Sequence, residues 1–176
     1  LLYKIKLIIT MENKIFKNLS KICKTINCVK DELDIIKYSK DWRGRINEKA
    51  LCVVFPKNQD EVSKILKFCY DNDIKVIPQG GNTNLVASAS PSKEKKEIII
   101  NMEKINQIHH IDILNKCVEV DAGVKIDDLN TSLEKDGFLL PLEMASTGSS
   151  QVGGVISTNA GGINVLHYGS VRNNLL

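Results

Sequence analysis

Two glycine-rich segments carry the residues best suited to hold an anionic ligand, and the first spans residues 78–85 (PQGGNTNL). Glycine has no Cβ, so the consecutive main-chain N–H groups of Gly80 and Gly81 can turn toward a phosphate without obstruction. The amide and hydroxyl side chains of residues 82–84 add donors for phosphate oxygens. The segment therefore indicates a phosphate cradle, with an ordinary turn as the alternative that its spacing also allows.

The second segment spans residues 148–162 (GSSQVGGVISTNAGG) and combines hydroxyl side chains with paired glycines. A short apolar stretch after Gly153 and Gly154 can begin a helix, whose first N–H groups lack internal partners and attract anions. Taken by itself, the segment is equally compatible with a glycine-rich surface loop. Two such segments in one chain favour a long cofactor that bears phosphates.

Known nucleotide motifs and catalytic signatures do not fit this chain. Gly148 and Gly153 have the spacing of a P-loop, but Gly154 and Val155 stand where that loop requires Lys and Ser or Thr. No G-x-G-x-x-G motif follows a predicted strand, and no nucleophile motif is present. The three histidines lack the spacing of metal ligands. We therefore predict no catalytic residue and no metal site in this chain.

The first glycine-rich segment follows a predicted strand–helix–strand unit. The apolar run Leu51–Phe55 predicts a buried strand, and residues 75–78 predict the next one. Between them, Asn58 and Glu61 resemble a capping box at the start of an amphipathic helix. Ligands of open α/β sheets bind at the carboxyl ends of parallel strands, which is where this segment begins.

The remaining pattern predicts an α+β fold, with a small parallel βαβ subdomain and a mixed or antiparallel subdomain. Further elements are expected as helices within 12–38, a charged surface loop at 92–97, a strand at 98–100, a hairpin of 105–111 with 117–121, and a helix over 126–133 ended by Gly137.

Composition narrows the class of protein. The 176 residues include 24 Lys and Arg against 21 Asp and Glu, so the net charge of +3 gives no support for nucleic-acid binding. The apolar residues 1–10 are too short for a membrane span, which needs about 20 residues. The five scattered cysteines are expected to be free thiols in a reducing compartment. Without a targeting segment, we expect a cytoplasmic location.

The ordered motifs resemble the PCMH-type FAD-binding domain of the vanillyl-alcohol oxidase superfamily, most closely its D-lactate and D-2-hydroxyglutarate dehydrogenase branch. The residues that carry the resemblance are DWRGR at 41–45, VFP at 54–56, PQGGNTNLV at 78–86, VEVDAGV at 118–124, the second glycine-rich segment and HYGSVRNN at 167–174. The expected organisation is an N-terminal helical extension over 1–40 and an FAD-binding domain over 41–176 that is truncated at its C-terminus.

The resemblance implies that the first segment wraps the FAD pyrophosphate and that the second, with the Pro-Leu pair before it, lines the rest of the cofactor. The implied cofactor-binding residues are Pro78, Gly80, Gly81, Asn82, Thr83, Asn84, Leu85, Pro141, Leu142, Gly148, Ser149, Gly153, Gly154, Thr158, Asn159, Gly161 and Gly162. Some superfamily members carry a flavin-linked histidine in the first loop, where this chain has Asn82 and Thr83, so we expect non-covalent FAD.

The family transfers hydride from a D-2-hydroxy acid to the flavin and passes the electrons to a separate acceptor. The resemblance implies that substrate binding belongs to a C-terminal domain, which we expect to be missing from this chain. Asn84, Ala87, Ser88 and Ala89 replace family glycines and a serine, and Asn84 is expected to tolerate a positive φ. The alternatives are a truncated gene remnant without activity, or a relative of UDP-N-acetylenolpyruvoylglucosamine reductase.

Overall fold

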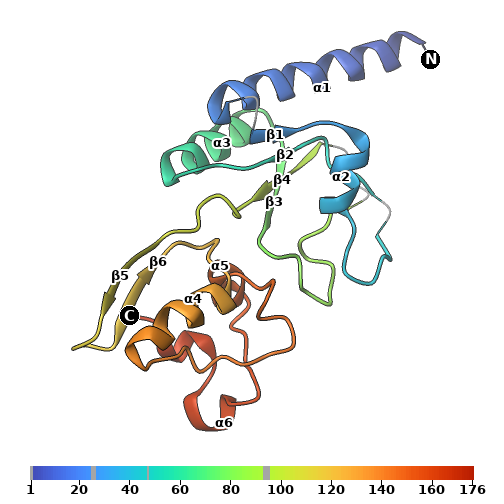
Figure 1. The fold of residues 1–176 in the computed structure, drawn as a ribbon. Helices are drawn as coiled ribbons and strands as arrows, with labels where there is room; N and C mark the ends of the chain where they lie inside the picture. The colour runs from blue at the N-terminus through green and yellow to red at the C-terminus, as the bar shows by residue number, and fades with distance from the viewer. Residues whose placement is uncertain (1, 25–26, 47, 93–95) are drawn as a thin grey trace. The chain divides into compact units, whose positions relative to one another are not determined.

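The computed structural model describes residues 2–24, 27–46, 48–92 and 96–176. The chain divides into two compact units. The first unit comprises Leu1–Gln79 and Asn84–Asn101, and the second comprises Gly80–Thr83 and Met102–Leu176. The first unit contains a largely parallel sheet and the second an antiparallel one, so the predicted α+β class is confirmed (Figure 1).

The first unit is built on a four-stranded sheet in the order β1-β2-β4-β3. The strands are β1 (Cys28–Val29), β2 (Val53–Val54), β3 (Lys75–Gln79) and β4 (Glu97–Asn101). β4 pairs in parallel with β2 and with β3, whereas β1 pairs antiparallel with β2. All five residues of β4 are buried, as expected for the central strand of a covered parallel sheet. β3 lies at an edge and therefore tolerates Pro78.

Three helices accompany this sheet: α1 (Leu2–Cys23), α2 (Glu32–Ser39) and α3 (Gln59–Asp71). α1 packs against α3 and β1, and α3 also packs against β3 (Figure 1). Ile35 of α2 belongs to a core cluster with Val53, Ile77 and Ile99. α2 and α3 each begin after a capping residue. The side chains of Asp31 (before α2) and Asn58 (before α3) accept main-chain N–H groups of the first helical turn.

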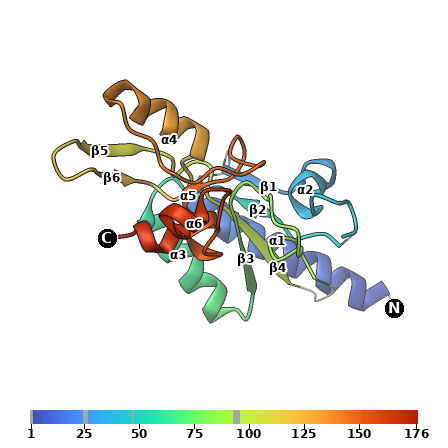
Figure 2. The same cartoon turned by 90° about the horizontal axis from the view of Figure 1, so that it is seen from below.

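The second unit contains the hairpin of β5 (Ile108–Asp112) and β6 (Cys117–Val120), which runs as a two-stranded ribbon in both views (Figure 2). The helices are α4 (Ile126–Leu133), α5 (Val152–Ser157) and α6 (Val165–Tyr168), with 3-10 turns η2 (Glu134–Asp136) and η3 (Val171–Asn174). The core gathers buried residues of α4, α5 and η3 together with Val124 and Leu142. Gly137 ends η2 in the left-handed conformation, as predicted.

Several predicted boundaries need correction. α1 begins at Leu2 rather than within residues 12–38, and β1 interrupts the expected helical region. Only half of the predicted capping box forms, because the Glu61 carboxylate accepts the N–H of Lys57 rather than that of Asn58. Glu97 was expected in a charged surface loop, but it is buried in β4 and accepts hydrogen bonds from Ser92. Residues 93–95 of that loop lie outside the described residues.

The cysteines are all free thiols, as expected, and Cys23, Cys52 and Cys69 are buried in the first unit. Burial raises the pKa of Cys52 to about 12 and that of Cys69 to about 11, so both thiols stay protonated at neutral pH. Within the described residues, no helix has the length and apolar character needed to cross a membrane.

Candidate functional site

The two glycine-rich segments meet inside the second unit. A Cβ on Gly81 would overlap the carbonyl oxygen of Ser149, so only glycine allows this contact. The hydroxyl oxygens of Thr83 and Ser150 lie 3.0 Å apart, and that of Ser146 lies 2.9 Å from Ser150. Ser150 is buried. A chain of three hydroxyls therefore ties the end of the first segment to the second.

Gln151 extends this junction and leaves one polar atom without a partner. Its side chain is 5% exposed, and Oε1 has no hydrogen-bond donor among the described residues. A Cβ on Gly80 would lie 3.1 Å from that oxygen. The main chain of Gln151 is held in place by a bridge to Lys125. A buried acceptor without a donor is unfavourable, and such atoms commonly mark a ligand or an ordered water.

Main-chain N–H groups are also left unpaired at this junction. Within the described part of the chain, those of Gly80, Gly81 and Gly154 donate no hydrogen bond. Gly154 is exposed, and a Cβ on it would meet no atom within 4 Å. Free N–H groups on glycines are the donors that phosphate cradles use. The second unit therefore offers several main-chain donors to an anion.

Other predicted contact residues hold the chain itself together. A Cβ on Gly153 would lie 2.7 Å from Ala122, and one on Gly162 would overlap the main chain of Glu143. Asn159 accepts the N–H of Arg172, whose guanidinium donates to the carbonyls of Ile156 and Ser157 at the end of α5. These positions explain the local packing whether or not they also touch a cofactor.

A small pocket of about 210 Å³ lies near Leu142 in the second unit. Leu142 itself is buried in the core, and Pro141 is half-buried. The carboxyl groups of Asp127, Glu134 and Glu143 line this pocket. Three carboxylates disfavour an anionic group, so the pocket is unsuited to the pyrophosphate that the first segment is predicted to hold.

The first glycine-rich segment and the residues after it, up to Ala89, form one loop, which we call the first loop. Its residues from Asn84 onward belong to the first unit. Gln79 is buried at its base, where Nε2 donates to the carbonyls of Tyr38 (2.7 Å) and Ala89 (2.8 Å). Asn84 Oδ1 accepts the N–H of Ser88 at 2.9 Å. Positive φ values occur at Asn82 and Ala87, whereas the sequence suggested Asn84 for that conformation. The side chain of Asn84 instead closes the turn over residues 84–88 by its hydrogen bond from Ser88.

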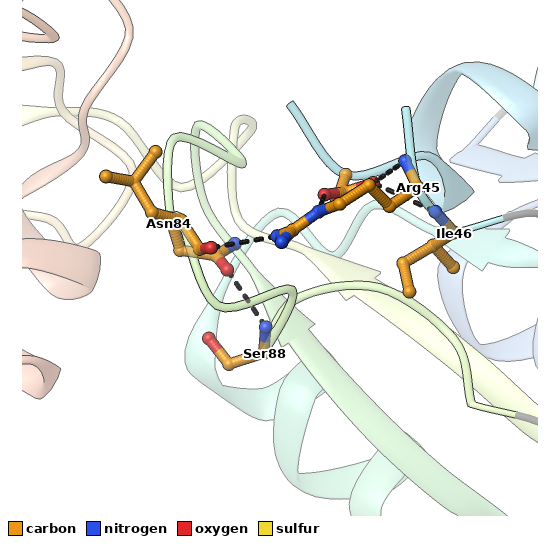
Figure 3. Close-up of polar contacts among 6 residues, drawn as sticks. Arg45, Ile46, Asn84 and Ser88 are labelled. Carbon is orange, nitrogen blue, oxygen red and sulfur yellow. Dashed lines mark hydrogen bonds and ion pairs between the residues drawn. The ribbon is translucent and has the colours of Figure 1, made fainter. Parts of the chain in front are cut away.

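The segment that begins at Asp41 contacts this loop through one arginine (Figure 3). The Asp41 side chain, 2% exposed, accepts the main-chain N–H groups of Arg45 (2.6 Å) and Ile46 (3.0 Å) and pairs with Arg45 Nε at 3.2 Å. Arg45 Nη2 donates to the carbonyl of Leu85 at 3.0 Å. Burial opposes ionisation of Asp41, but these N–H groups stabilise the carboxylate, so its pKa lies below the ordinary value.

Comparison with known protein families matches residues 50–176 to the FAD binding domain. The match covers well over half of the chain. This chain belongs to the FAD binding domain family. The assignment confirms FAD as the cofactor that the family resemblance implied. The unpaired glycine N–H groups, the open space at Gly154 and the orphaned Gln151 oxygen fit a ligand that bears both phosphates and hydrogen-bond donors.

The curated proteins that this FAD binding domain is similar to include dehydrogenases of the predicted branch. The chain is 36% identical over 143 residues to the D-2-hydroxyglutarate–pyruvate transhydrogenase of Saccharomyces cerevisiae, covering 81% of this chain and 28% of that protein. It is 36% identical to a putative D-lactate dehydrogenase of Schizosaccharomyces pombe (83% and 27%) and 35% identical to the D-2-hydroxyglutarate dehydrogenase of Arabidopsis thaliana (85% and 26%). The chain thus spans about a quarter of these relatives.

Solved structures confirm the PCMH-type fold. Alkyldihydroxyacetonephosphate synthase matches with a TM-score of 0.82 at 22% identity, over 92% of this chain and 32% of that protein. p-Cresol methylhydroxylase matches with a TM-score of 0.71 at 19% identity, over 85% of this chain and 29% of that protein. At these identities the likeness establishes the fold.

The relatives also overturn one expectation. The cytoplasmic location is wrong, because the Schizosaccharomyces pombe and Arabidopsis thaliana proteins are both named as mitochondrial. The expected cytoplasmic location rested only on the lack of a recognisable targeting segment, and no residue pattern supported it.

Three residues of the junction, Ser146, Ser150 and Gln151, were not among the individually predicted cofactor-binding residues, although Ser150 and Gln151 lie in the second glycine-rich segment. The density of hydroxyl side chains over 146–150 was the available signal. Asp41 and Arg45 were noticed only as part of a motif, without a role. The 40 positions between Arg45 and Leu85 hide the contact that the structure shows between them.

Proposed function

We propose that this chain is the FAD-binding portion of a flavin-dependent dehydrogenase that oxidises a D-2-hydroxy acid of the lactate or 2-hydroxyglutarate type. The observation that carries the proposal is the junction of the two glycine-rich segments, which puts unpaired N–H groups at Gly80 and Gly81 in the same unit as Gly154. Support for the substrate class comes from the names of the relatives.

The division of labour follows from what the described residues can do. When bound, FAD supplies a hydride acceptor for the carbon that carries the hydroxyl group of the substrate. Main-chain N–H groups of the junction bind the pyrophosphate, and the hydroxyl chain through Ser150 keeps the two segments in register. The stretch that aligns with this chain is only about a quarter of each relative, so we assign substrate binding to the remaining part of such a protein and the electrons to a separate acceptor.

Two finer features belong to the same proposal. FAD is held without a covalent bond, since residues 80–85 of the first loop contain amide and hydroxyl side chains and no histidine. The protein acts in the mitochondrion, as the names of two relatives suggest. We further propose that the cofactor-binding region extends over 41–176 and that residues 1–40 form an N-terminal extension.

The test uses the 176-residue chain incubated with FAD and passed through gel filtration. We expect visible flavin absorbance to co-elute with the protein and to move entirely to the supernatant after acid precipitation. We also expect no bleaching by D-lactate or D-2-hydroxyglutarate without oxygen, because this chain supplies cofactor binding alone. A chain that is folded by circular dichroism and yet elutes without flavin would overturn the proposal.

A further inference from the structure

The turn that begins at Asp41 is built around a buried carboxylate. Oδ1 accepts the N–H groups of Arg45 and Ile46, and Oδ2 pairs with Arg45 Nε (Figure 3). The aspartate side chain is 2% exposed, whereas that of Arg45 is 52% exposed. Asp41 therefore fixes both the main chain and the guanidinium of Arg45, and the remaining donors of that guanidinium point in a set direction.

One of those donors reaches the loop of the predicted cofactor site. Arg45 Nη2 donates to the carbonyl oxygen of Leu85 at 3.0 Å, across 40 positions of sequence. In a trans peptide the C=O and the following N–H point in opposite directions. Holding the Leu85 carbonyl toward Arg45 thus turns the N–H of Val86 away from it. Within the described part of the chain, that N–H donates to no acceptor.

The loop on either side of this peptide is held by other contacts of the first unit. Asn84 Oδ1 accepts the N–H of Ser88, and Gln79 Nε2 holds the carbonyl of Ala89. Ala87 sits between them at φ +58, a conformation that L residues rarely adopt without support. The contact from Arg45 acts on the peptide that lies between Asn84 and Ser88, at the end of the segment predicted to wrap the pyrophosphate, where Leu85 and Val86 are both exposed.

We propose that Arg45, oriented by Asp41, is a positioning residue for FAD: it fixes the peptide between Leu85 and Val86 and thereby presets the first loop for the cofactor. The inference rests on the proposed function. Arg45 acts here through a main-chain carbonyl, so its contribution depends on a directed hydrogen bond rather than on charge alone.

The experiment compares FAD dissociation constants, from quenching of flavin fluorescence, for the wild-type chain and three variants. Arg45→Met removes the donor and Arg45→Lys keeps one. Arg43→Met is the matched control, because it removes an equal charge from an exposed neighbour in the same motif. We expect about tenfold weaker binding for Arg45→Met, the loss typical of one charge-assisted hydrogen bond, and substantial rescue by Arg45→Lys. Arg43→Met should bind like the wild type.

Circular dichroism of each variant without FAD separates positioning from folding. If Arg45→Met fails to fold, Arg45→Gln, which keeps a neutral donor, takes its place with the same expectation of weaker binding than Arg45→Lys. Equal FAD affinity of a folded Arg45→Met and the wild type would overturn the inference, as would an equal loss in Arg43→Met. A wild-type chain that binds no FAD would instead refute the proposed function.

Discussion

A Cβ on Gly81 would overlap the main chain of Ser149, whereas a Cβ on Gly154 would meet no atom within 4 Å. At the residue scale, the second glycine of a Gly-Gly pair therefore has a different physical cause in each of the two segments. Gly81 is glycine because two loops of the protein touch there. Gly154 faces open space and keeps an unpaired N–H, as a position reserved for a ligand would. The sequence alone gave both glycines the same interpretation.

The two substitutions to alanine should separate these causes. Gly81→Ala should lower the free energy of unfolding by about 2–3 kcal/mol, because the main chain of Ser149 must move to admit the methyl group. Gly154→Ala should raise it by about 0.5–1 kcal/mol, since alanine favours the helix and meets no neighbour. Urea unfolding without FAD measures both, and equal effects would contradict the assignment.

At the element scale, an ionisable pair joins His109 of β5 to Asp121, which directly follows β6. His109 Nε2 lies 2.8 Å from Asp121 Oδ1, and Asp121 also accepts the N–H of Gln107. The hydrogen bond to Asp121 raises the pKa of His109 above its ordinary value of 6.5. Burial opposes ionisation of Asp121, but the bonds from His109 and Gln107 lower its pKa.

The sign of the pH dependence follows from these directions. A raised histidine pKa gives stability that is complete below the unfolded value of 6.5 and disappears as the pH rises through the folded value. His109→Gln should therefore destabilise the chain more at about pH 5.5 than at about pH 8.5. Thermal unfolding at the two values is the measurement. His110→Gln, which leaves the pair in place, is the control; a pH-independent loss in His109→Gln would contradict this account.

Elements with strong apolar runs were predictable from the sequence, and those that depend on distant partners were not. Residues 98–100 had to be buried, and they form the central strand β4. β1 contains two residues and exists because it pairs with β2, so no local pattern announces it. Glu97 looked exposed by its charge, yet hydrogen bonds from Ser92 satisfy its carboxylate inside the sheet.

At the scale of the whole molecule, the chain distributes the first loop between two compact units. Gly80–Thr83 belong to the second unit and the residues from Asn84 onward belong to the first. The junction at Thr83 and Ser150 joins positions 67 apart in sequence, which no local pattern could reveal. The sequence predicted two loops that bind the cofactor. The structure shows the hydrogen bonds that hold these two loops together.

Glycine-selective 15N labelling with an FAD titration followed by NMR tests the central claim most directly, because the chain has eleven glycines and each contributes one amide signal. We predict that the amides of Gly80, Gly81 and Gly154 shift together as FAD saturates the chain. Gly137, which ends the 3-10 turn η2 outside the proposed cradle, should stay unchanged. Saturable FAD binding that leaves the three cradle amides unmoved would contradict the account.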